Sequence, residues 1–333
     1  MERNWNDPSK SSPEYDAPKR KSRILLITAL LVLLLLFVAG LLILRGIDSA
    51  QTAILPPVTS SNSEIPTVTP TPAASSAPVG LRVTFLDVGQ GDCAFLESPS
   101  GKTMLIDGGP ESAFPAIDTL LTQRGVSGLD VVIASHLHAD HIGGLIQVID
   151  AYPVGIFYDP PFDAESEVYF ELLDAIQENH VVTASPLAGA DTLLPWDASV
   201  EVRVLAPYQT VYSDFNDTSY ILRISYGETS VLFTGDATAL GEKLALKALP
   251  NRYFHANVLK IGHHGSSDST SEKFLETVAP SLAVISVGKG NEYGLPDQEL
   301  LDRLKSQGIT VLRTDEDGTV TLLLDGTNVT VVK

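Results

Sequence analysis

Four side chains of the kinds that bind metal ions fall within six residues, directly after an apolar run. His136, His138, Asp140 and His141 follow residues 131–135, which are predicted to form a strand, and a helix is predicted to open at His141. His136 and His138 share one side of extended backbone and can hold one ion, whereas Asp140 and His141 lie past the turn and suit a second. Imidazole and carboxylate ligands favour zinc-, manganese- or iron-type ions over calcium. Three of the seven histidines gather here, which argues against a chance surface cluster.

The first fifth of the chain differs in composition from the rest. Residues 24–44 are 21 residues without charge or proline, and about 20 apolar residues are enough for a helix to span a membrane. Lys19, Arg20, Lys21 and Arg23 precede this run, so the N-terminus is expected in the cytoplasm and the remainder outside. A cleaved signal peptide is the alternative, but its apolar region usually has only about 7–15 residues. An uncleaved membrane anchor is therefore the favoured interpretation.

The composition divides the rest of the chain in two. Residues 45–80 are rich in Pro, Ser and Thr and lack apolar periodicity, which predicts a disordered, extended linker. This linker would connect the folded part to the membrane span, which the cytoplasmic tail (1–23) precedes. From 81 to 333, β-rich runs alternate with amphipathic helices, and this length is enough for one well-buried domain. Such a pattern predicts an α/β (α+β) domain with two sheets face to face and helices outside.

Charge and cysteine usage narrow the possible functions. Residues 1–45 contribute +3 to the net charge of −19, so the remainder carries −22. An acidic surface slows the approach of polyanions, which counts against a tight nucleic-acid binder unless a basic strip or bound metals compensate. Cys93 is the single cysteine, so neither a disulfide framework nor a thiolate metal cluster is possible, and its apolar neighbours predict a buried, inert thiol.

Several segments resemble one known family, in the order in which that family has them. HLHADH at 136–141 resembles the HxHxDH motif of the metallo-β-lactamase superfamily. FLDVGQGDCAFLESPSGKTMLIDGG (85–109), VLFTGDA (231–237) and VLKIGHHGSSDSTS (258–271) resemble the hydrolase domain of the ComEC family of competence proteins. The resemblance runs from about residue 81 to residue 333. It implies a four-layer αββα metallo-β-lactamase sandwich with a metal-dependent hydrolase activity.

The resemblance also implies roles for residues beyond the first cluster. Asp236 would bridge two ions, and either His263 or His264 would complete the second metal site; we favour His264, which leaves the other to bind phosphate or donate a proton. The family's Asn-Asp-x-Ser pattern makes Asp217 a candidate ligand of the first ion, although a turn or helix cap is a common role for such a pair. The expected catalytic residues are Asp140, Asp236 and His264, and the expected metal ligands are His136, His138, Asp140, His141, Asp217, Asp236, His263 and His264.

Three further aspartates accompany the glycine-rich turns of these motifs. Asp87 and Asp92 flank Gly89 and Gly91, and Asp107 precedes a Gly-Gly pair. We expect these carboxylates to orient the ligand histidines from behind, which fixes the ring tautomers. Direct metal contact by Asp107 is a less favoured alternative.

The chain departs from the pattern of its relatives in two places. Many superfamily members supply a further histidine before the bridging aspartate, but that interval here holds only His180, at the end of a helical stretch and expected on the surface. Relatives often read Tyr-Gly-His-Pro-His where this chain has Leu295 and Asp297 in place of both histidines. The second departure concerns the substrate rather than the metal core.

Together these features predict an enzyme with two divalent ions, Zn²⁺ or Mn²⁺, whose shared water is ionised to a bridging hydroxide near neutral pH. The first hypothesis is a phosphodiesterase or nuclease acting on an extracellular substrate such as DNA. The alternative is hydrolysis of another cell-envelope ester, such as a teichoic-acid phosphodiester, a lactone or an amide. An inactive metal-binding domain that recruits partners at the membrane is a third hypothesis, and the intact ligand set argues against it.

Overall fold

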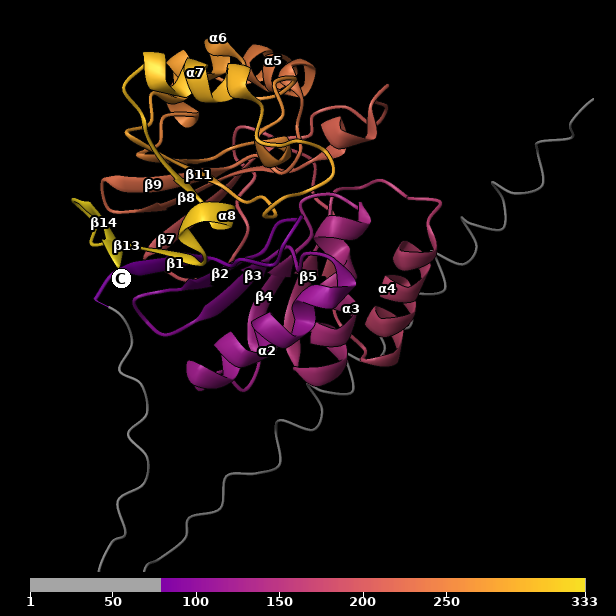
Figure 1. Ribbon diagram of the computed structural model, residues 1–333. Helices are drawn as coiled ribbons and strands as arrows, with labels where there is room; N and C mark the ends of the chain where they lie inside the picture. The colour runs from indigo at the N-terminus through magenta and orange to yellow at the C-terminus, as the bar shows by residue number, and fades with distance from the viewer. Residues whose placement is uncertain (1–78, 333) are drawn as a thin grey trace, which may run out of the picture. The chain divides into compact units, whose positions relative to one another are not determined.

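The computed structural model describes residues 79–332, which fold around two β-sheets (Figure 1). The first sheet contains, in spatial order, β14 (Val329–Val332), β13 (Val320–Leu324), β1 (Leu81–Phe85), β2 (Ala94–Glu97), β3 (Thr103–Ile106), β4 (Leu129–Ile133), β5 (Val154–Tyr158) and β6 (Thr183–Ala184). The second contains β12 (Thr310–Arg313), β11 (Leu282–Ile285), β10 (Val258–Lys260), β9 (Thr229–Phe233), β8 (Ile221–Tyr226) and β7 (Val200–Ala206).

Helices cover the outer faces of both sheets (Figure 1). The helices packed on the first sheet are α2 (Phe114–Gln123), α3 (Ala139–Ala151) and α4 (Glu167–Glu178), and those on the second are α5 (Ala239–Ala248), α6 (Glu272–Val278) and α7 (Gln298–Ser306). Short turns of helix complete the domain: η1 (Glu111–Ala113), η2 (Phe215–Thr218), η3 (Asn251–Tyr253), η4 (His263–Gly265) and α8 (Thr314–Asp317).

Three apolar clusters hold these layers together. One fills the space between the sheets, and the other two lie between each sheet and its helices. In β4, Val131 and Ile133 join the inter-sheet cluster while Val132 packs under the helices. Because both faces of such strands are covered, they are apolar throughout rather than alternating. The expected mixed α/β sandwich is confirmed.

The last hairpin returns to the start of the domain. β13 pairs antiparallel with β1, with Leu324 opposite Leu81, and β14 then forms the edge of the same sheet. The C-terminal strands therefore complete the sheet that begins with β1, although they come last in the chain.

Two predicted boundaries around the histidine cluster shift. Helix α3 begins at Ala139 rather than at His141, because His138 is the last extended residue and occupies the N-cap. Strand β4 ends at Ile133 rather than at residue 135, and the Ser135 amide donates to a side chain, Asp107 Oδ1, instead of a strand partner. Asp140 and His141 consequently occupy the first turn of a helix.

The predicted tail (1–23), membrane span (24–44) and nearly all of the linker (45–80) lie outside the described residues. Within 79–332, no helix combines the length and apolar character that crossing a membrane requires.

Candidate metal centre

The candidate metal ligands come from loops at the carboxyl ends of strands in both sheets. In the first sheet β3, β4 and β5 run parallel, and in the second β9, β10 and β11 do. The carboxyl ends of each set therefore share one sheet edge. His136 and His138 lie in the β4–α3 loop, Asp236 lies in the β9–α5 loop, and His264 follows β10. Loops from one sheet thus meet loops from the other.

His136, His138 and Asp236 form the first group of side chains that could hold an ion. His136 Nε2 lies 3.0 Å from His138 Nδ1 and 3.8 Å from Asp236 Oδ2. Burial lowers the pKa of His136 well below its ordinary value, and the nearby His141 lowers it further. The ring is therefore neutral, which is the form that binds a metal.

Asp92, His141, Asp236 and His264 form the second group. His141 Nε2 lies 3.3 Å and His264 Nε2 3.5 Å from Asp236 Oδ2, so Asp236 belongs to both groups. His141 Nε2 and Asp236 Oδ1 are buried and have no hydrogen-bond partner among the described residues. Buried polar atoms are rarely left unpaired, and divalent ions would satisfy both. The residues present therefore fit two ions that share Asp236.

A carboxylate behind His141 fixes the orientation of its ring. His141 Nδ1 donates to Asp107 Oδ2 at 3.0 Å, and Asp107 Oδ1 accepts from the Ser135 amide at 2.6 Å. This directs an Nδ1 proton to Asp107 and points Nε2 toward Asp236, the usual arrangement behind a metal-binding histidine. Asp107 adopts a φ of 58°, a left-handed backbone conformation that is uncommon for a residue other than glycine.

His264 is held in the same manner by groups on its Nδ1 side. Nδ1 lies 3.0 Å from the carbonyl oxygen of Ser286 and 3.2 Å from Asp92 Oδ1. The other oxygen of Asp92 lies 2.5 Å from Lys260 Nζ. A lysine cation beside Asp92 would repel an ion there. We therefore place Asp92 behind the His264 ring, although its distances put it within the second group.

In the second group, the negative charges of the carboxylates are balanced by the positive charges of the histidine rings. Although burial opposes it, Asp236 and Asp107 raise the pKa of His141 well above its ordinary value, and Asp236 and Asp92 raise the pKa of His264 to about 10. The two histidines in turn hold the pKa of Asp236 well below its usual range, against the effect of burial. The carboxylates thus hold protonated imidazoles, and metal loading would displace those protons.

Asp140 lies at the border of the second group. Its Oδ2 is 3.1 Å from His264 Nε2 and 4.0 Å from His141 Nε2, and 35% of its side chain is exposed. Burial would raise the pKa of Asp140, but the hydrogen bond with His264 and the charge of His141 lower it overall. Asp140 is thus a charged carboxylate that faces both the ligand histidines and the solvent.

The structure places Asp217 outside both groups and against the start of α5. Asp217 Oδ1 accepts hydrogen bonds from the Thr238 amide, the Thr238 hydroxyl and the Gly241 amide, at 3.0, 2.8 and 3.1 Å. A Cβ atom at Gly241 would lie 2.6 Å from this oxygen, so glycine permits the close approach. The carboxylate thus accepts hydrogen bonds at the N-terminus of α5, whose N-cap residue is Thr238, a contact between distant segments rather than the local turn or cap that was the alternative to metal binding. Its Oδ2 is buried without a hydrogen-bond partner among the described residues.

The same segment ties the two halves of the centre together. Ser219 Oγ accepts from the Asp236 amide at 3.1 Å, and the Tyr220 amide donates to the carbonyl of Ser135 at 2.8 Å. One chain segment therefore contacts both the loop that carries His136 and the loop that carries Asp236. We call residues 217–220 the clamp.

His263 and Asp297 flank the centre without entering either group. His263 Nδ1 lies 3.0 Å from Asp268 Oδ1, and this hydrogen bond raises the pKa of His263. Asp297 Oδ2 accepts from the Ser267 amide at 2.7 Å, and the Asp297 amide donates to Gly265 at 2.9 Å. Asp297, which replaces a histidine of the relatives, thus holds the loop that follows the His263–His264 pair.

The remaining sequence predictions concern single residues. Cys93 is buried, as predicted, and burial raises the pKa of its thiol well above its ordinary value. His180 is exposed just beyond α4, also as predicted. The supporting roles of Ser135, Ser286 and Lys260 were not predicted. Lys260 alone carried a signal, because a charged residue in an otherwise apolar strand needs a buried partner.

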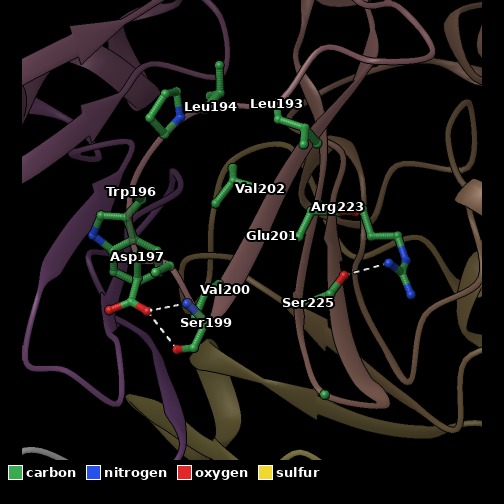
Figure 2. A pocket seen from close by; sticks show the side chains of 13 residues that line it. Leu193, Leu194, Trp196, Asp197, Ser199, Val200, Glu201, Val202, Arg223 and Ser225 are labelled. Atoms are coloured by element: carbon green, nitrogen blue, oxygen red, sulfur yellow. Dashed lines mark hydrogen bonds between the residues drawn. The ribbon is translucent and has the colours of Figure 1, made fainter.

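Two cavities differ in their relation to this centre. Figure 2 shows one of about 570 Å³ beside β7, where Ser199 donates hydrogen bonds to Asp197 and Arg223 donates one to Ser225. None of its lining residues belongs to either ligand group, so this cavity lies apart from the metal centre. A second cavity, of about 680 Å³, is lined in part by Asp140 and adjoins the centre.

Comparison with known proteins identifies the family. The model of the metallo-β-lactamase superfamily matches residues 86–289, which include both ligand groups. The chain belongs to the metallo-β-lactamase superfamily. In this superfamily member, the HxHxDH motif supplies ligand candidates to both groups, and Asp236 joins the groups together.

Curated relatives of this metallo-β-lactamase-fold chain include proteins named for competence, which confirms the resemblance. It is 32% identical over 255 residues to ComE operon protein 3 of Bacillus subtilis (strain 168), covering 72% of this chain and 32% of that protein. It is 31% identical over 239 residues to competence protein ComA of Neisseria gonorrhoeae, covering 71% and 31%. The chain thus spans about a third of the length of these relatives.

Solved structures add support for the fold alone. The diiron β-hydroxylase CmlA from Streptomyces venezuelae superposes with a TM-score of 0.50 at 16% identity, covering 74% of this chain and 55% of that one. At this identity the comparison shows the fold and says nothing about activity.

Proposed function

We propose that this chain is a phosphodiester hydrolase with two divalent metal ions. The observation that carries the proposal is that two groups of ligand-type side chains share Asp236. His136 and His138 would hold one ion, and His141 and His264 the other. A pair of divalent ions supplies an activated water at neutral pH and stabilises charge on both the attacking and the leaving oxygen, which suits in-line phosphoryl displacement.

The chain's own residues have distinct parts in this reaction. The attacking water gives one proton to the solvent as its oxygen forms a bond to phosphorus, one ester P–O bond breaks, and the departing alkoxide takes up a proton. Asp140, whose pKa is lowered overall, is a weak base, so we assign it to orienting the attacking water rather than removing its proton. His263, whose pKa the hydrogen bond to Asp268 raises, is the candidate donor to the leaving oxygen.

Two classes of substrate are considered for this hydrolase, DNA and other esters of the cell envelope. Relatives named as competence proteins favour DNA, whereas the net charge of −22 beyond residue 45 favours another ester of the cell envelope.

We also propose that residues 24–44 anchor the chain in the cell membrane, with the hydrolase domain outside. Protease added to intact cells should then degrade the domain, and a domain protected until the cells are lysed would refute this orientation.

The direct test is an assay of the full-length chain, purified in mild detergent, stripped with chelator and reloaded with Mn²⁺ or Zn²⁺. Bis-p-nitrophenyl phosphate, plasmid DNA and single-stranded DNA are offered in parallel, with Asp140→Ala as the control. Metal-dependent cleavage of DNA that is lost in the variant supports a nuclease. Cleavage of the small diester alone directs the search to envelope polymers. Two bound ions without turnover of any diester would overturn the proposal.

A further inference from the structure

The hydroxyl of Ser135 lies between ligand candidates of both groups. Ser135 Oγ is 3.3 Å from His136 Nδ1, which belongs to the first group, and 3.3 Å from His141 Nδ1, which belongs to the second. The centroids of the two rings are 4.2 Å apart, and all three residues are buried. One side chain therefore contacts both histidines at Nδ1, whereas their Nε2 atoms face Asp236.

The two histidines differ in what else holds their Nδ1 atoms. His141 Nδ1 has a second, charged partner, because Asp107 Oδ2 lies 3.0 Å away. For His136 Nδ1, Ser135 Oγ is the one hydrogen-bond partner within residues 79–332. A hydroxyl thus occupies the place behind His136 that a carboxylate occupies behind His141.

A hydroxyl is suited to this place by its hydrogen-bonding capacity. A histidine that binds an ion through Nε2 carries its proton on Nδ1, and that proton needs an acceptor. A serine hydroxyl can accept a hydrogen bond and can also donate one. Ser135 Oγ can therefore accept from His136 Nδ1 when Nε2 binds an ion, and donate to the same atom when Nε2 carries the proton. An ionised carboxylate, which only accepts, would support the first arrangement alone.

The backbone around Ser135 fixes the place of its hydroxyl. The Ser135 amide donates to Asp107 Oδ1 at 2.6 Å, and the Ser135 carbonyl accepts from the Tyr220 amide at 2.8 Å. A Cβ atom at Gly235 would lie 3.0 Å from Ser135 Oγ, so glycine leaves the room that the hydroxyl needs. Both loops that carry ligand candidates therefore contribute to the position of this one atom.

We propose that Ser135 is a positioning residue of the metal centre, whose hydroxyl orients His136 toward the first ion and supports His141 at the second. This inference rests on the two-ion centre of the proposed function, but not on the identity of its substrate. The dependence is unequal, because Asp107 still orients His141 when the hydroxyl is removed, whereas His136 loses its partner.

Two single-site backgrounds separate the ions for the test. His264→Asn is expected to keep the first ion, and His138→Asn is expected to keep the second. In the full-length chain, Ser135→Ala should weaken Zn²⁺ binding by about 10–100-fold in the His264→Asn background. In the His138→Asn background the loss should be less than about tenfold. Competition against a chromogenic chelator measures both affinities without any turnover.

Ser286→Ala is the matched control, because it removes another buried hydroxyl beside the same centre. Ser286 Oγ has no hydrogen-bond partner in the described domain, and the contact with His264 Nδ1 is made by the carbonyl oxygen, which alanine keeps. The control should leave both affinities unchanged, and urea unfolding shows whether the two variants are equally stable. Unchanged Zn²⁺ binding by Ser135→Ala in the His264→Asn background, or a larger loss at the second ion than at the first, would overturn the inference.

Nitrogen NMR of isotope-labelled histidine supplies a readout that a general loss of stability would not move. In the zinc-loaded unmodified chain, with the signals assigned by His136→Asn, the His136 ring should carry its proton on Nδ1. A proton on Nε2 of His136 would overturn the inference even if Ser135→Ala failed to fold. A chain that binds two ions but cleaves no diester would refute the proposed hydrolysis alone, and the affinities would still decide the role of Ser135. A chain that binds no ion would refute both.

Discussion

At the scale of single residues, neighbours in the sequence have different surroundings because the backbone turns sharply between strand β10 and its following loop. His263 and His264 both adopt positive φ values, of 49° and 51°. The His264 ring is directed into the buried centre, whereas 27% of the His263 side chain is exposed and its Nδ1 pairs with Asp268. This difference leads to a prediction for each histidine.

His264→Asn should lose one of two bound ions, whereas His263→Asn should keep both. Loss of a supporting residue typically costs about 10–100-fold in metal affinity, so loss of a ligand should cost more than about 100-fold. Metal content by mass spectrometry after dialysis, together with competition against a chelator, measures this. If the His263 variant were the one to lose an ion, the assignment of the pair would be reversed.

At the scale of elements, the clamp connects the end of one loop with the start of a helix. Asp217 has two possible roles, as an acceptor at the N-terminus of α5 through Oδ1 or as a metal ligand through Oδ2, which has no hydrogen-bond partner within residues 79–332. The geometry favours the role at α5, because three donors converge on Oδ1. Asparagine keeps an oxygen that can accept these hydrogen bonds, whereas alanine removes it, so the two substitutions separate the roles.

Asp217→Ala should lower the free energy of unfolding by about 1–3 kcal/mol, because it leaves buried donors without a partner. Asp217→Asn should cost less than Asp217→Ala and should retain two ions. Urea unfolding and metal content are measured on both variants. Loss of an ion in Asp217→Asn with little change in stability would instead establish Asp217 as a ligand.

The buried carboxylate of Glu242 connects two of the helices that pack on the second sheet. It lies on α5 and accepts hydrogen bonds from the Thr270 and Ser271 amides at the start of α6. Burial raises the pKa of Glu242 from 4.5 to about 7, although these hydrogen bonds and the charge of Arg303 lower it. The folded protein therefore binds this proton more tightly than the unfolded chain does.

The stability that Glu242 contributes should be present below about pH 4.5 and lost as the pH rises to about 7. A pKa difference of this size corresponds to about 3 kcal/mol. The free energy of unfolding of the unmodified protein should accordingly fall relative to that of Glu242→Gln between about pH 5 and pH 8. Urea unfolding of both metal-free proteins at several pH values measures the difference, and parallel curves would contradict the shifted pKa.

At the scale of the whole molecule, charge acts on the approach of a substrate rather than on the chemistry. The chain beyond residue 45 carries −22, and the cavity that Asp140 and four glutamates line adds local negative charge beside the centre. Raising the ionic strength from about 0.01 M to 0.15 M shortens the screening length from about 30 Å to about 8 Å. Repulsion of a polyanion then weakens, while a small diester is affected far less.

Cleavage of single-stranded DNA at low substrate concentration should therefore become faster as salt is added over this range. Initial rates at a fixed concentration of divalent metal, compared with those on bis-p-nitrophenyl phosphate, provide the measurement. A DNA rate that falls with salt would show that a basic strip of the protein binds the strand, as in most nucleic-acid binders.

Local sequence was sufficient for much of this fold and site. The alternation of β-rich runs with amphipathic helices from residue 81 was predicted, because continuous apolar runs and amphipathic periodicity are local properties. The cluster from His136 to His141 was equally visible, since its ligand-type side chains are neighbours in the chain. The family assignment followed from short motifs and is confirmed by the match over residues 86–289.

The sequence by itself determined the kinds of side chain available and the strands after which they come. Tertiary structure decided which of them meet: it put Asp236 beside His141, separated His264 from His263, and turned Asp217 toward α5. It also brought glutamates from three segments to one cavity and returned the last hairpin to β1. The physical reason is that these contacts join residues far apart in the chain, and their geometry depends on how two sheets pack rather than on local backbone preference.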